Sequence, residues 1–235
     1  MNEKKYLNCY DYPHYYESAF SFRNIVHEVD LIEQTIKKFS KCAGKNFLEL
    51  GCGPAFHMLE LAQRGYHYSG LDLNEAMLAY SRAKASKAAI QADFIKGSMV
   101  DFHLAQKMSY IFIALGSLYA NSTKEVEQVF QSAANALESG GLFLLDWCVQ
   151  FDPAQLFSAE GQSWEVLEDK VKIQTSVVMK QTNKVEQLFE EQLEMKVDNG
   201  EQVQLLRSYS TKKAIYPQEF LLLLKNIKQF EFLGW

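Results

Sequence analysis

Two short segments of the chain carry residue types and spacings that could do chemistry. Residues 47–54, FLELGCGP, form an apolar run that leads into two glycines separated by one residue. Such glycines let the backbone turn sharply and approach a ligand where a Cβ would clash. Residues 68–73, YSGLDL, place Asp72 after a second apolar run, where a carboxylate can accept hydrogen bonds from both hydroxyls of a ribose. Together the two segments indicate a site for an adenosine-type ligand.

The elements that must position these residues are a strand, a glycine turn, a helix and a second strand. The apolar run before Gly51 is consistent with a buried strand. Phe56, Leu59 and Ala62 recur at helical spacing after the glycines, and Gly65 is placed to end the helix. This order of elements is half of a nucleotide-binding α/β fold.

Dinucleotides and S-adenosylmethionine are the two cofactor classes that compete for such a site. The dinucleotide fingerprint G-x-G-x-x-G requires a third glycine for close packing of the helix against the strand. Phe56 occupies that position here, so a pyrophosphate would meet a helix that carries a bulky side chain. The pattern therefore favours S-adenosylmethionine.

At these residues the sequence resembles the class I S-adenosylmethionine-dependent methyltransferases. Residues 48–65, LELGCGPAFHMLELAQRG, look like the first motif of that family, and residues 70–78, GLDLNEAML, look like the second. An ordinary glycine turn after a buried strand would explain the leucines, but not their coincidence with Glu49 and Asp72. The resemblance implies that S-adenosylmethionine is bound by residues of both motifs: Glu49, Gly51, Cys52, Gly53, Asp72, Leu73 and Met77.

The composition suits one globular domain and argues against several functions. With 235 residues, 48% of them hydrophobic and 23% charged, the chain is long enough to bury a full core. A net charge of -5 argues against nucleic acid as a partner, because phosphate binding needs clustered Lys and Arg. The cysteines are scattered without a C-x-x-C pair, so we expect no metal site and a reducing cytoplasmic environment: Cys9, Cys42, Cys52 and Cys148.

The sequence also predicts a soluble protein that does not enter a membrane. The N-terminal residues lack the apolar centre of a signal peptide. The longest apolar run, residues 220–224, is too short to cross a bilayer.

An N-terminal arm, residues 1–22, is rich in aromatic side chains but shows no clean helical or strand period. We expect it to pack its rings on the main domain as a short helix or ordered arm. The S-adenosylmethionine-binding core is expected over residues 23–150. It starts with a helix whose apolar stripe runs over residues 25–39 at intervals of three and four.

Alternating strand and helix patterns over the core predict a doubly wound, mostly parallel Rossmann-like sheet. Asn74 is a good N-cap for a helix that reaches about residue 87. Buried strands are expected at residues 90–95, 110–115 and 142–147. A helical stripe at residues 126–137 should end at Gly140 and Gly141.

The pattern changes after residue 150. Residues 151–215 lose the helix signals and predict an inserted antiparallel β-meander of three or four strands, in which Leu193, Met195 and Val197 form a buried face. Residues 216–235 should close the core with a helix at 218–226 and a last strand at 229–233.

The end of the expected sheet differs from the family's pattern. Methyltransferases of this class finish with one further antiparallel strand, and too few residues follow residue 233 to form it. We therefore expect a shortened or rearranged sheet, or a partner over this edge. The acidic residues 186–194 together with such an edge would allow a homodimer.

The resemblance is strongest to small-molecule N-methyltransferases, namely glycine N-methyltransferase and the amino-sugar N,N-dimethyltransferases. In that group an aromatic arm precedes an arginine that reaches the methionyl carboxylate of the cofactor. Tyr15, Tyr16 and Arg23 occupy the corresponding positions, and Tyr15 is a candidate on the acceptor side. The alternative is that Arg23 contacts no ligand and is exposed to solvent at the start of the following helix.

Two further segments are similar to family motifs. Residues 113–121, IALGSLYAN, are similar to the fourth motif, in which Leu115 would contact the cofactor through its backbone. Ser117 and Asn121 match acceptor-side positions that often carry Asn and His. Ser98 and Met99 match the pair that reads adenine, where an acidic or amide side chain usually stands in place of the serine.

Methyl transfer from a sulfonium is an in-line displacement that chiefly requires position and alignment. A neutral amine is already a nucleophile, whereas an oxygen acceptor more often needs a His or Lys base. His57 and His103 do not lie at the family's acceptor position, so we expect them to be structural or exposed.

We therefore predict a methyltransferase that acts on the nitrogen of a small-molecule amine. Two alternatives stay open: a methyltransferase for an oxygen or peptide acceptor, and a non-catalytic relative with a regulatory or assembly role. An NAD-dependent enzyme is a distant further alternative.

Overall fold

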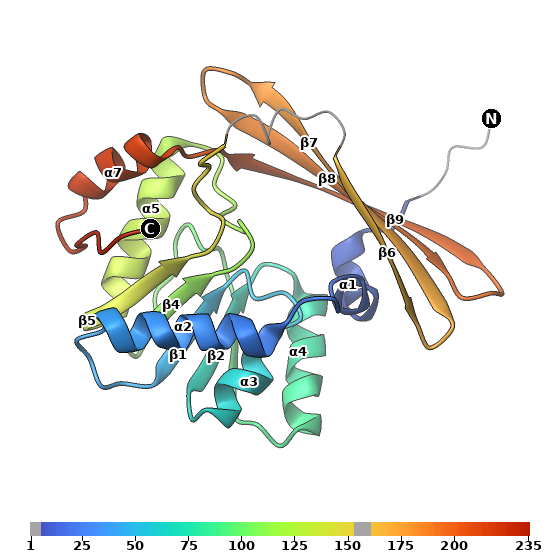
Figure 1. Ribbon diagram of the computed structural model, residues 1–235, viewed down its shortest axis with the longest axis horizontal. Helices are drawn as coiled ribbons and strands as arrows, with labels where there is room; N and C mark the ends of the chain where they lie inside the picture. Colours follow the sequence, from blue (N-terminus) through green and yellow to red (C-terminus); the bar gives the residue numbers. More distant parts are fainter. Residues whose placement is uncertain (1–5, 153–160) are drawn as a thin grey trace.

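The computed structural model describes residues 6–152 and 161–235. Five parallel strands form the central sheet in the order β3-β2-β1-β4-β5 (Figure 1). Along the chain they are β1 Asn46–Leu50, β2 His67–Asp72, β3 Asp93–Lys96, β4 Met108–Ile113 and β5 Leu137–Leu145. The strand order reverses between β1 and β4, so a ligand crevice is expected at the carboxyl ends of these two strands. The doubly wound parallel fold expected from the sequence is confirmed.

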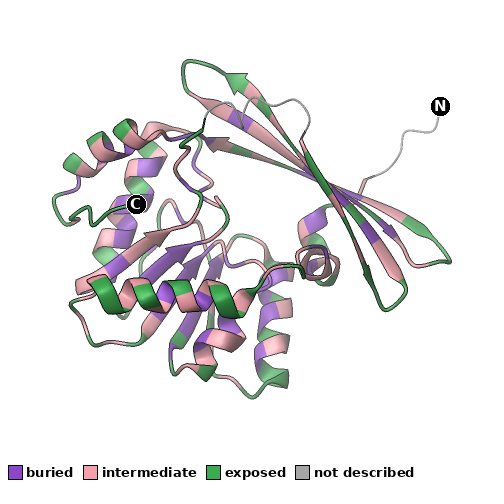
Figure 2. Cartoon of the chain, viewed as in Figure 1, coloured by how far each residue is buried: buried purple, intermediate pink, exposed green. Residues whose placement is uncertain are grey.

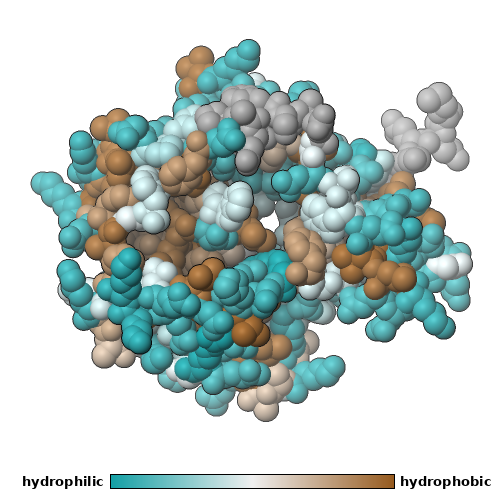
Figure 3. Space-filling view, viewed as in Figure 1, coloured by the Kyte–Doolittle hydropathy of each residue, from teal (hydrophilic) through white to brown (hydrophobic). Residues whose placement is uncertain are grey.

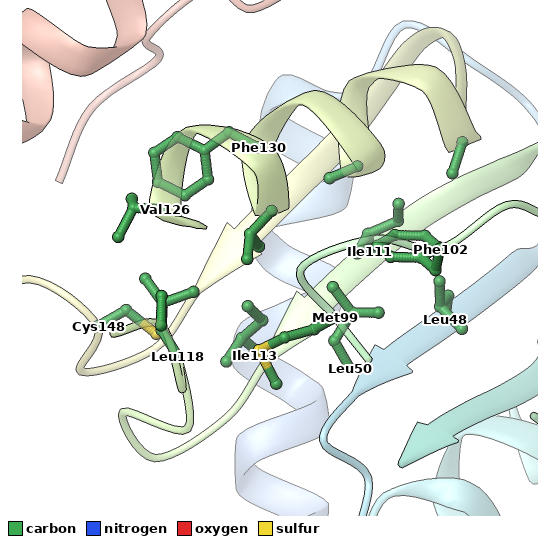
Figure 4. Packing of buried hydrophobic residues seen from close by; sticks show 14 of the residues in the cluster. Leu48, Leu50, Met99, Phe102, Ile111, Ile113, Leu118, Val126, Phe130 and Cys148 are labelled. Carbon is green, nitrogen blue, oxygen red and sulfur yellow. The ribbon is translucent and has the colours of Figure 1, made fainter. Parts of the chain in front are cut away.

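Helices cover both faces of this sheet. One face carries α2 (Ile25–Phe39), α3 (Met58–Gln63) and α4 (Glu75–Lys87), and the other carries α5 (Thr123–Ala136) and α7 (Pro217–Lys225). Alternate residues of β1 serve the two cores, because Phe47 packs on the first face and Leu48 on the second. Figure 4 shows Val126 and Phe130 of α5 over the second core. None of the described helices is long and apolar enough to cross a membrane.

The second sheet has four antiparallel strands in the order β6-β7-β8-β9. They are β6 Gln162–Glu168, β7 Val171–Asn183, β8 Leu188–Asp198 and β9 Val203–Lys213. Leu193, Met195 and Val197 are buried while Lys196 between them is exposed, which confirms the expected alternation. In Figure 2 burial is continuous in the central parallel strands, whereas the hairpin ends of the second sheet are exposed.

The aromatic arm packs on this second sheet, which corrects the expectation that its rings lie on the parallel core. It consists of a 3-10 turn, Cys9–Asp11, and α1, Pro13–Ala19. Its rings join a cluster that contains Met195 and Leu206 of the sheet. The backbone N–H of Leu7 donates to the carbonyl of Leu205 at 3.0 Å, so the arm also pairs with the edge strand β9. Arm and sheet therefore form one structural unit.

Several boundaries in the core differ from the sequence-based expectation, and β4 ends two residues earlier than expected, at Ile113. β3 starts at Asp93 rather than at residue 90. α5 ends at Ala136 and β5 follows at once, so Gly140 lies inside the strand, where its φ of +81° accommodates a register shift against β4. Residues 229–233 are not a strand. Phe230 instead packs on Phe143 of β5, with ring centroids 5.8 Å apart.

Candidate cofactor and acceptor site

The turn between β1 and α3 brings backbone to the crevice without covering it. Gly51 and Gly53 have φ of +68° and +52°, a region that glycine enters without strain. A Cβ on Gly53 would meet no atom within 4 Å, so this glycine presents its backbone to open space. A Cβ on Gly51 would lie 3.7 Å from the Cβ of Ser117, which places the loop after β4 against the glycine turn.

Asp72 joins this turn at the carboxyl end of β2. Its Oδ2 accepts a hydrogen bond of 2.8 Å from the backbone N–H of Gly53, and its Oδ1 accepts one of 2.8 Å from Asn74. Burial raises the pKa of Asp72, and the backbone N–H donors partly offset that rise. Each oxygen still has a lone pair for a ligand hydroxyl. Leu73 beside it is 68% exposed at the rim of the crevice.

Several side chains of the two motifs point into the core instead. Cys52, Met77 and Met99 are buried, so a ligand can reach these residues through their backbone only. The Sγ of Cys52 lies 2.7 Å from a Cβ built on Gly70, which fixes the thiol against β2. Burial keeps the pKa of this thiol well above its ordinary value. These motif residues shape the turn and do not offer their side chains to a ligand.

Glu49 is also buried, and its carboxylate is fully engaged within the protein. Its Oε1 lies 2.8 Å from Nδ1 of His57, and its Oε2 accepts a hydrogen bond of 2.6 Å from the hydroxyl of Tyr68. The Nε2 of His57 lies 2.9 Å from Oε2 of Glu28 on α2. His57 is completely buried, and each of its ring nitrogens faces a carboxylate. His103 is exposed and lies 3.7 Å from Asp101.

Arg23 ends this chain of charged groups and is not solvent-exposed. Its Nε and Nη2 donate to the two oxygens of Glu28 at 3.1 and 2.5 Å, and its guanidinium lies 4.7 Å from the centre of the Phe56 ring. Its side chain is only 7% exposed. The interpretation of Arg23 as a solvated residue at a helix start is therefore wrong.

The loop after β4 lies at the opposite wall of the crevice. Leu115 has φ of +49° and is 46% exposed, and its N–H donates to Oδ2 of Asp146 at 2.9 Å. Its carbonyl, rather than its N–H, is the backbone group left for a ligand. Ser117 is half-buried in this loop. Asn121 is exposed, and its N–H donates to Glu125 next to the N-cap of α5.

Ser98 lies at the carboxyl end of β3 with its hydroxyl in a local turn. The Oγ accepts a hydrogen bond of 3.2 Å from the N–H of Val100. The remaining lone pair is the acceptor that Ser98 can offer to an adenine amine.

The arm closes one side of the crevice through contacts with α4 and the glycine turn. Asn74 donates to Asp11 at 3.1 Å, and Lys84 donates to Glu17 at 2.6 Å and to the carbonyl of Pro54 at 2.7 Å. Tyr15 stacks on Tyr12 with ring centroids 6.1 Å apart.

Tyr16 is the arm residue that links the two halves of the crevice. It is half-buried, and its hydroxyl interacts electrostatically with Tyr10, Glu191, Arg23 and Asp72. Burial raises the pKa of its hydroxyl, so Tyr16 stays neutral.

A polar cluster joins the antiparallel sheet to the loop after β4. Glu191 of β8 accepts a hydrogen bond of 3.2 Å from the hydroxyl of Tyr119 and lies 2.6 Å from Nζ of Lys212. Tyr10 lies 3.4 Å from Ser210 beside them. Sequence reasoning did not find this cluster, because its members come from the arm, the loop after β4 and two strands of the insertion. Within the described residues no three His, Cys, Asp or Glu side chains converge as metal ligands.

A further cavity lies beside the edge strand β5. It has a volume of about 1220 Å³ and is lined by apolar and polar side chains of α2, β5, α7 and residues 229–235, and by Asp146. Figure 3 shows this hollowed apolar surface beside the C-terminal segment. The polar groups that could bind a nucleoside are at the strand ends instead.

With this geometry in place, comparisons with known proteins identify the core. Residues 47–141 match the family model described as a methyltransferase domain. These residues form a methyltransferase domain. The expected resemblance to S-adenosylmethionine-dependent methyltransferases is confirmed, and with it the class of cofactor.

One curated relative and two solved structures illustrate the similarity. A protein of Geobacillus sp. (strain WCH70), named for a methyltransferase activity, is 28% identical over 139 residues, or 56% of each chain. CalS10 of Micromonospora echinaspora, described as an amino pentose methyltransferase with bound S-adenosylmethionine, has a TM-score of 0.71 at 16% identity and covers 96% of this chain and 90% of its own.

The sugar N-methyltransferase KedS8 of Streptoalloteichus sp. has a TM-score of 0.71 at 16% identity and covers 96% of this chain and 86% of its own. At this identity the structural matches show the shared fold. The chain spans about half the length of the curated relatives it matches.

Proposed function

We propose that this protein transfers a methyl group from S-adenosylmethionine to the nitrogen of a small-molecule amine. The observation that carries this proposal is the carboxylate of Asp72, bonded to the N–H of Gly53 at 2.8 Å beside the open glycine turn. That arrangement fits a ribose held by a carboxylate next to backbone that can approach the rest of the nucleoside. Arg23, Leu115 and Ser98 complete the proposed cofactor site.

The cofactor supplies an activated methyl group on a sulfonium, and the protein supplies alignment. Ser117 of the loop after β4 lies against the glycine turn, and Tyr119 of the same loop donates to Glu191 of the antiparallel sheet. An acceptor held there would face the methyl group from the side of the antiparallel sheet. Arm and sheet together would exclude water from the transfer site.

We favour nitrogen over oxygen as the acceptor because Lys212, the lysine of the cluster on the antiparallel sheet, is paired with Glu191 at 2.6 Å and is not free to act as a base. His57 is buried between two carboxylates, and His103 is exposed next to Asp101. Burial raises the pKa of both Tyr16 and Tyr119, so neither is ionised near neutral pH. A neutral amine needs no base before it attacks. The amino-sugar acceptors named for the similar structures are consistent with this choice.

The test is transfer of a radiolabelled methyl group from S-adenosylmethionine to a panel of amines, amino sugars and phenols. The proposal predicts labelled N-methyl products from at least one amine and none from the phenols. Labelling of phenols alone would show that the acceptor is an oxygen. Labelling of no member of the panel, together with tight binding of S-adenosylhomocysteine, would favour a non-catalytic or more specialised role.

A further inference from the structure

A chain of four charged side chains, three of them nearly buried and Glu28 half-buried, connects the arm to the glycine turn. It runs from Arg23 through Glu28 and His57 to Glu49, and each neighbouring pair is within 2.9 Å at its shortest contact. The Oε2 of Glu28 is shared, because it lies 2.5 Å from Nη2 of Arg23 and 2.9 Å from Nε2 of His57. One carboxylate oxygen therefore binds both cations.

The partners of His57 determine its protonation state. Its two ring nitrogens each face a carboxylate oxygen, and ionised carboxylates only accept hydrogen bonds. Both nitrogens must then carry hydrogen, so the ring is an imidazolium. The chain holds two cations and two anions, and its net charge is zero.

This charge balance explains a contact that would otherwise be unfavourable. The Nη2 of Arg23 lies 3.2 Å from Nε2 of His57, although both groups are cationic. Glu28 between them offsets the repulsion. Without Glu28, Arg23 would move away or His57 would lose its proton.

Glu28 also fixes the direction of the guanidinium. It binds the Nε and Nη2 edge, and the ring of Phe56 lies 4.7 Å from the guanidinium carbon. Nη1 makes no hydrogen bond to any atom of residues 6–152 or 161–235, and it is not among the fully buried unpaired atoms of those residues. The free nitrogen of Arg23 is thus held in one orientation, and its N–H donors remain for a ligand carboxylate.

We propose that Glu28 and His57 are positioning residues that aim Nη1 of Arg23 at the α-carboxylate of the cofactor. This inference rests on the proposed function, since it assigns recognition of the amino-acid end of S-adenosylmethionine. Glu49 of β1 binds the other ring nitrogen of His57, so it anchors Glu28 and His57 to the parallel sheet. This arrangement of Glu28, His57 and Arg23 gives ligands that carry a carboxylate a higher affinity than nucleosides that lack one.

The experiment compares two probes by calorimetric titration. S-adenosylhomocysteine carries the amino-acid end, and 5′-methylthioadenosine lacks it. For Glu28→Gln we expect binding of S-adenosylhomocysteine to weaken about 10-fold, while binding of 5′-methylthioadenosine changes less than about 2-fold. Glu33→Gln is the matched control, because Glu33 lies on the same helix and pairs with Arg64 outside the crevice. It should change neither affinity.

If Glu28→Gln does not fold, Glu28→Asp is a second variant, and it keeps the charge balance. Its shorter side chain cannot bridge Arg23 and His57 as Glu28 does, so the same selective loss is expected. An equal loss for both probes, or an unchanged ratio, would overturn the proposal in favour of a purely structural role. Tighter binding of S-adenosylhomocysteine would also overturn it, because Glu28 would then compete for Arg23. If the unmodified protein binds neither probe, the proposed function itself fails.

Discussion

At the carboxyl end of β2, the two oxygens of Asp72 accept hydrogen bonds from the N–H groups of Gly53 and Asn74. Burial raises the pKa of this carboxyl, which means that the folded protein disfavours its charge. Keeping Asp72 ionised at neutral pH therefore lowers folding stability. A residue that costs stability in this way is a candidate for ligand binding.

We expect Asp72→Ala to weaken binding of S-adenosylhomocysteine by about 1.5 to 3 kcal/mol, the loss of charged hydrogen bonds to a ligand. The melting temperature should change little, because removal of a desolvated charge offsets the two lost backbone hydrogen bonds. Calorimetric titration and thermal melting measure the two effects. Asp101→Ala, which removes an exposed carboxylate after the next strand, is the control. Unchanged affinity in folded Asp72→Ala would exclude the ribose assignment.

The site residues that the sequence predicts are those whose position depends on local backbone conformation. Gly51, Gly53 and Asp72 form a fixed pattern of turn and strand end, so their spacing alone predicts their positions. Glu28 and Glu191 could not be found in this way. Their partners are distant in sequence, and no spacing marks either residue.

At the scale of elements, the chain of charged side chains joins α2, the glycine turn and β1. Although burial alone would lower it, Glu49 and Glu28 raise the pKa of His57 from 6.5 to about 9. Burial alone would raise the pKa of Glu28, but His57 and Arg23 lower it from 4.5 to about 2. The contribution of His57 to stability is complete below pH 6.5 and is lost as pH rises through about 9. The contribution of Glu28 is complete above pH 4.5 and is lost as pH falls through about 2.

Both contributions are complete only between pH 4.5 and 6.5, so we expect the melting temperature to be highest in this window. It should then fall as the pH is raised from 6.5 to 9. In His57→Gln this fall should be clearly smaller, because the titrating group is gone. Thermal melts of both proteins across this range provide the measurement. Parallel profiles for the two proteins would show that His57 is not an imidazolium in the folded state.

The contact between the arm and α4 offers a second prediction for an element. Glu17 of α1 pairs with Lys84 at 2.6 Å and accepts a hydrogen bond from Tyr80. We expect Glu17→Gln to weaken binding of S-adenosylhomocysteine about 3-fold through a less closed arm, with little change in melting temperature. Glu60→Gln, which removes an acid from a surface cluster around Arg64, is the control. A drop in melting temperature without loss of affinity would show that this contact stabilises the fold but does not contribute to ligand binding.

The elements themselves were largely predictable, and the exceptions have physical causes. The spacing of apolar residues predicted α2 and the alternation of β8, because burial of one face imposes a helical period on a helix and a period of two on a strand. The bulge around Gly140 depends on pairing with β4, which the local pattern does not contain. The apolar side chains of residues 229–233 pack on the core without backbone pairing, so the pattern wrongly predicted a strand.

For the whole molecule, we propose that the parallel core binds the cofactor and that the arm, together with the antiparallel sheet, covers the acceptor side. One possible test is deletion of the antiparallel sheet, residues 165–214. Because the arm packs on the sheet, this deletion would also release the arm from the crevice. It therefore cannot separate the role of the arm from the role of the sheet. A single substitution on the inner face of the sheet is the sharper test.

We expect Glu191→Gln to lower kcat/KM for the amine acceptor about 10-fold or more, because Lys212 and Tyr119 lose their common partner at the acceptor side. The affinity for S-adenosylhomocysteine should change less than about 2-fold. Steady-state transfer assays and calorimetry provide the two values. Glu190→Gln is the control, since this neighbour on β8 points to the opposite face of the sheet. Equal activity of both variants would show that the acceptor does not bind against this sheet.

The central claim is that the crevice at the ends of β1, β2 and β4 binds S-adenosylmethionine, and calorimetric titration of the purified protein tests it most directly. S-adenosylmethionine, S-adenosylhomocysteine and NAD are titrated separately under the same conditions. The account predicts saturable binding of the first two at one site per chain, competition between them, and no detectable heat with NAD. Binding of NAD without binding of S-adenosylhomocysteine would contradict it.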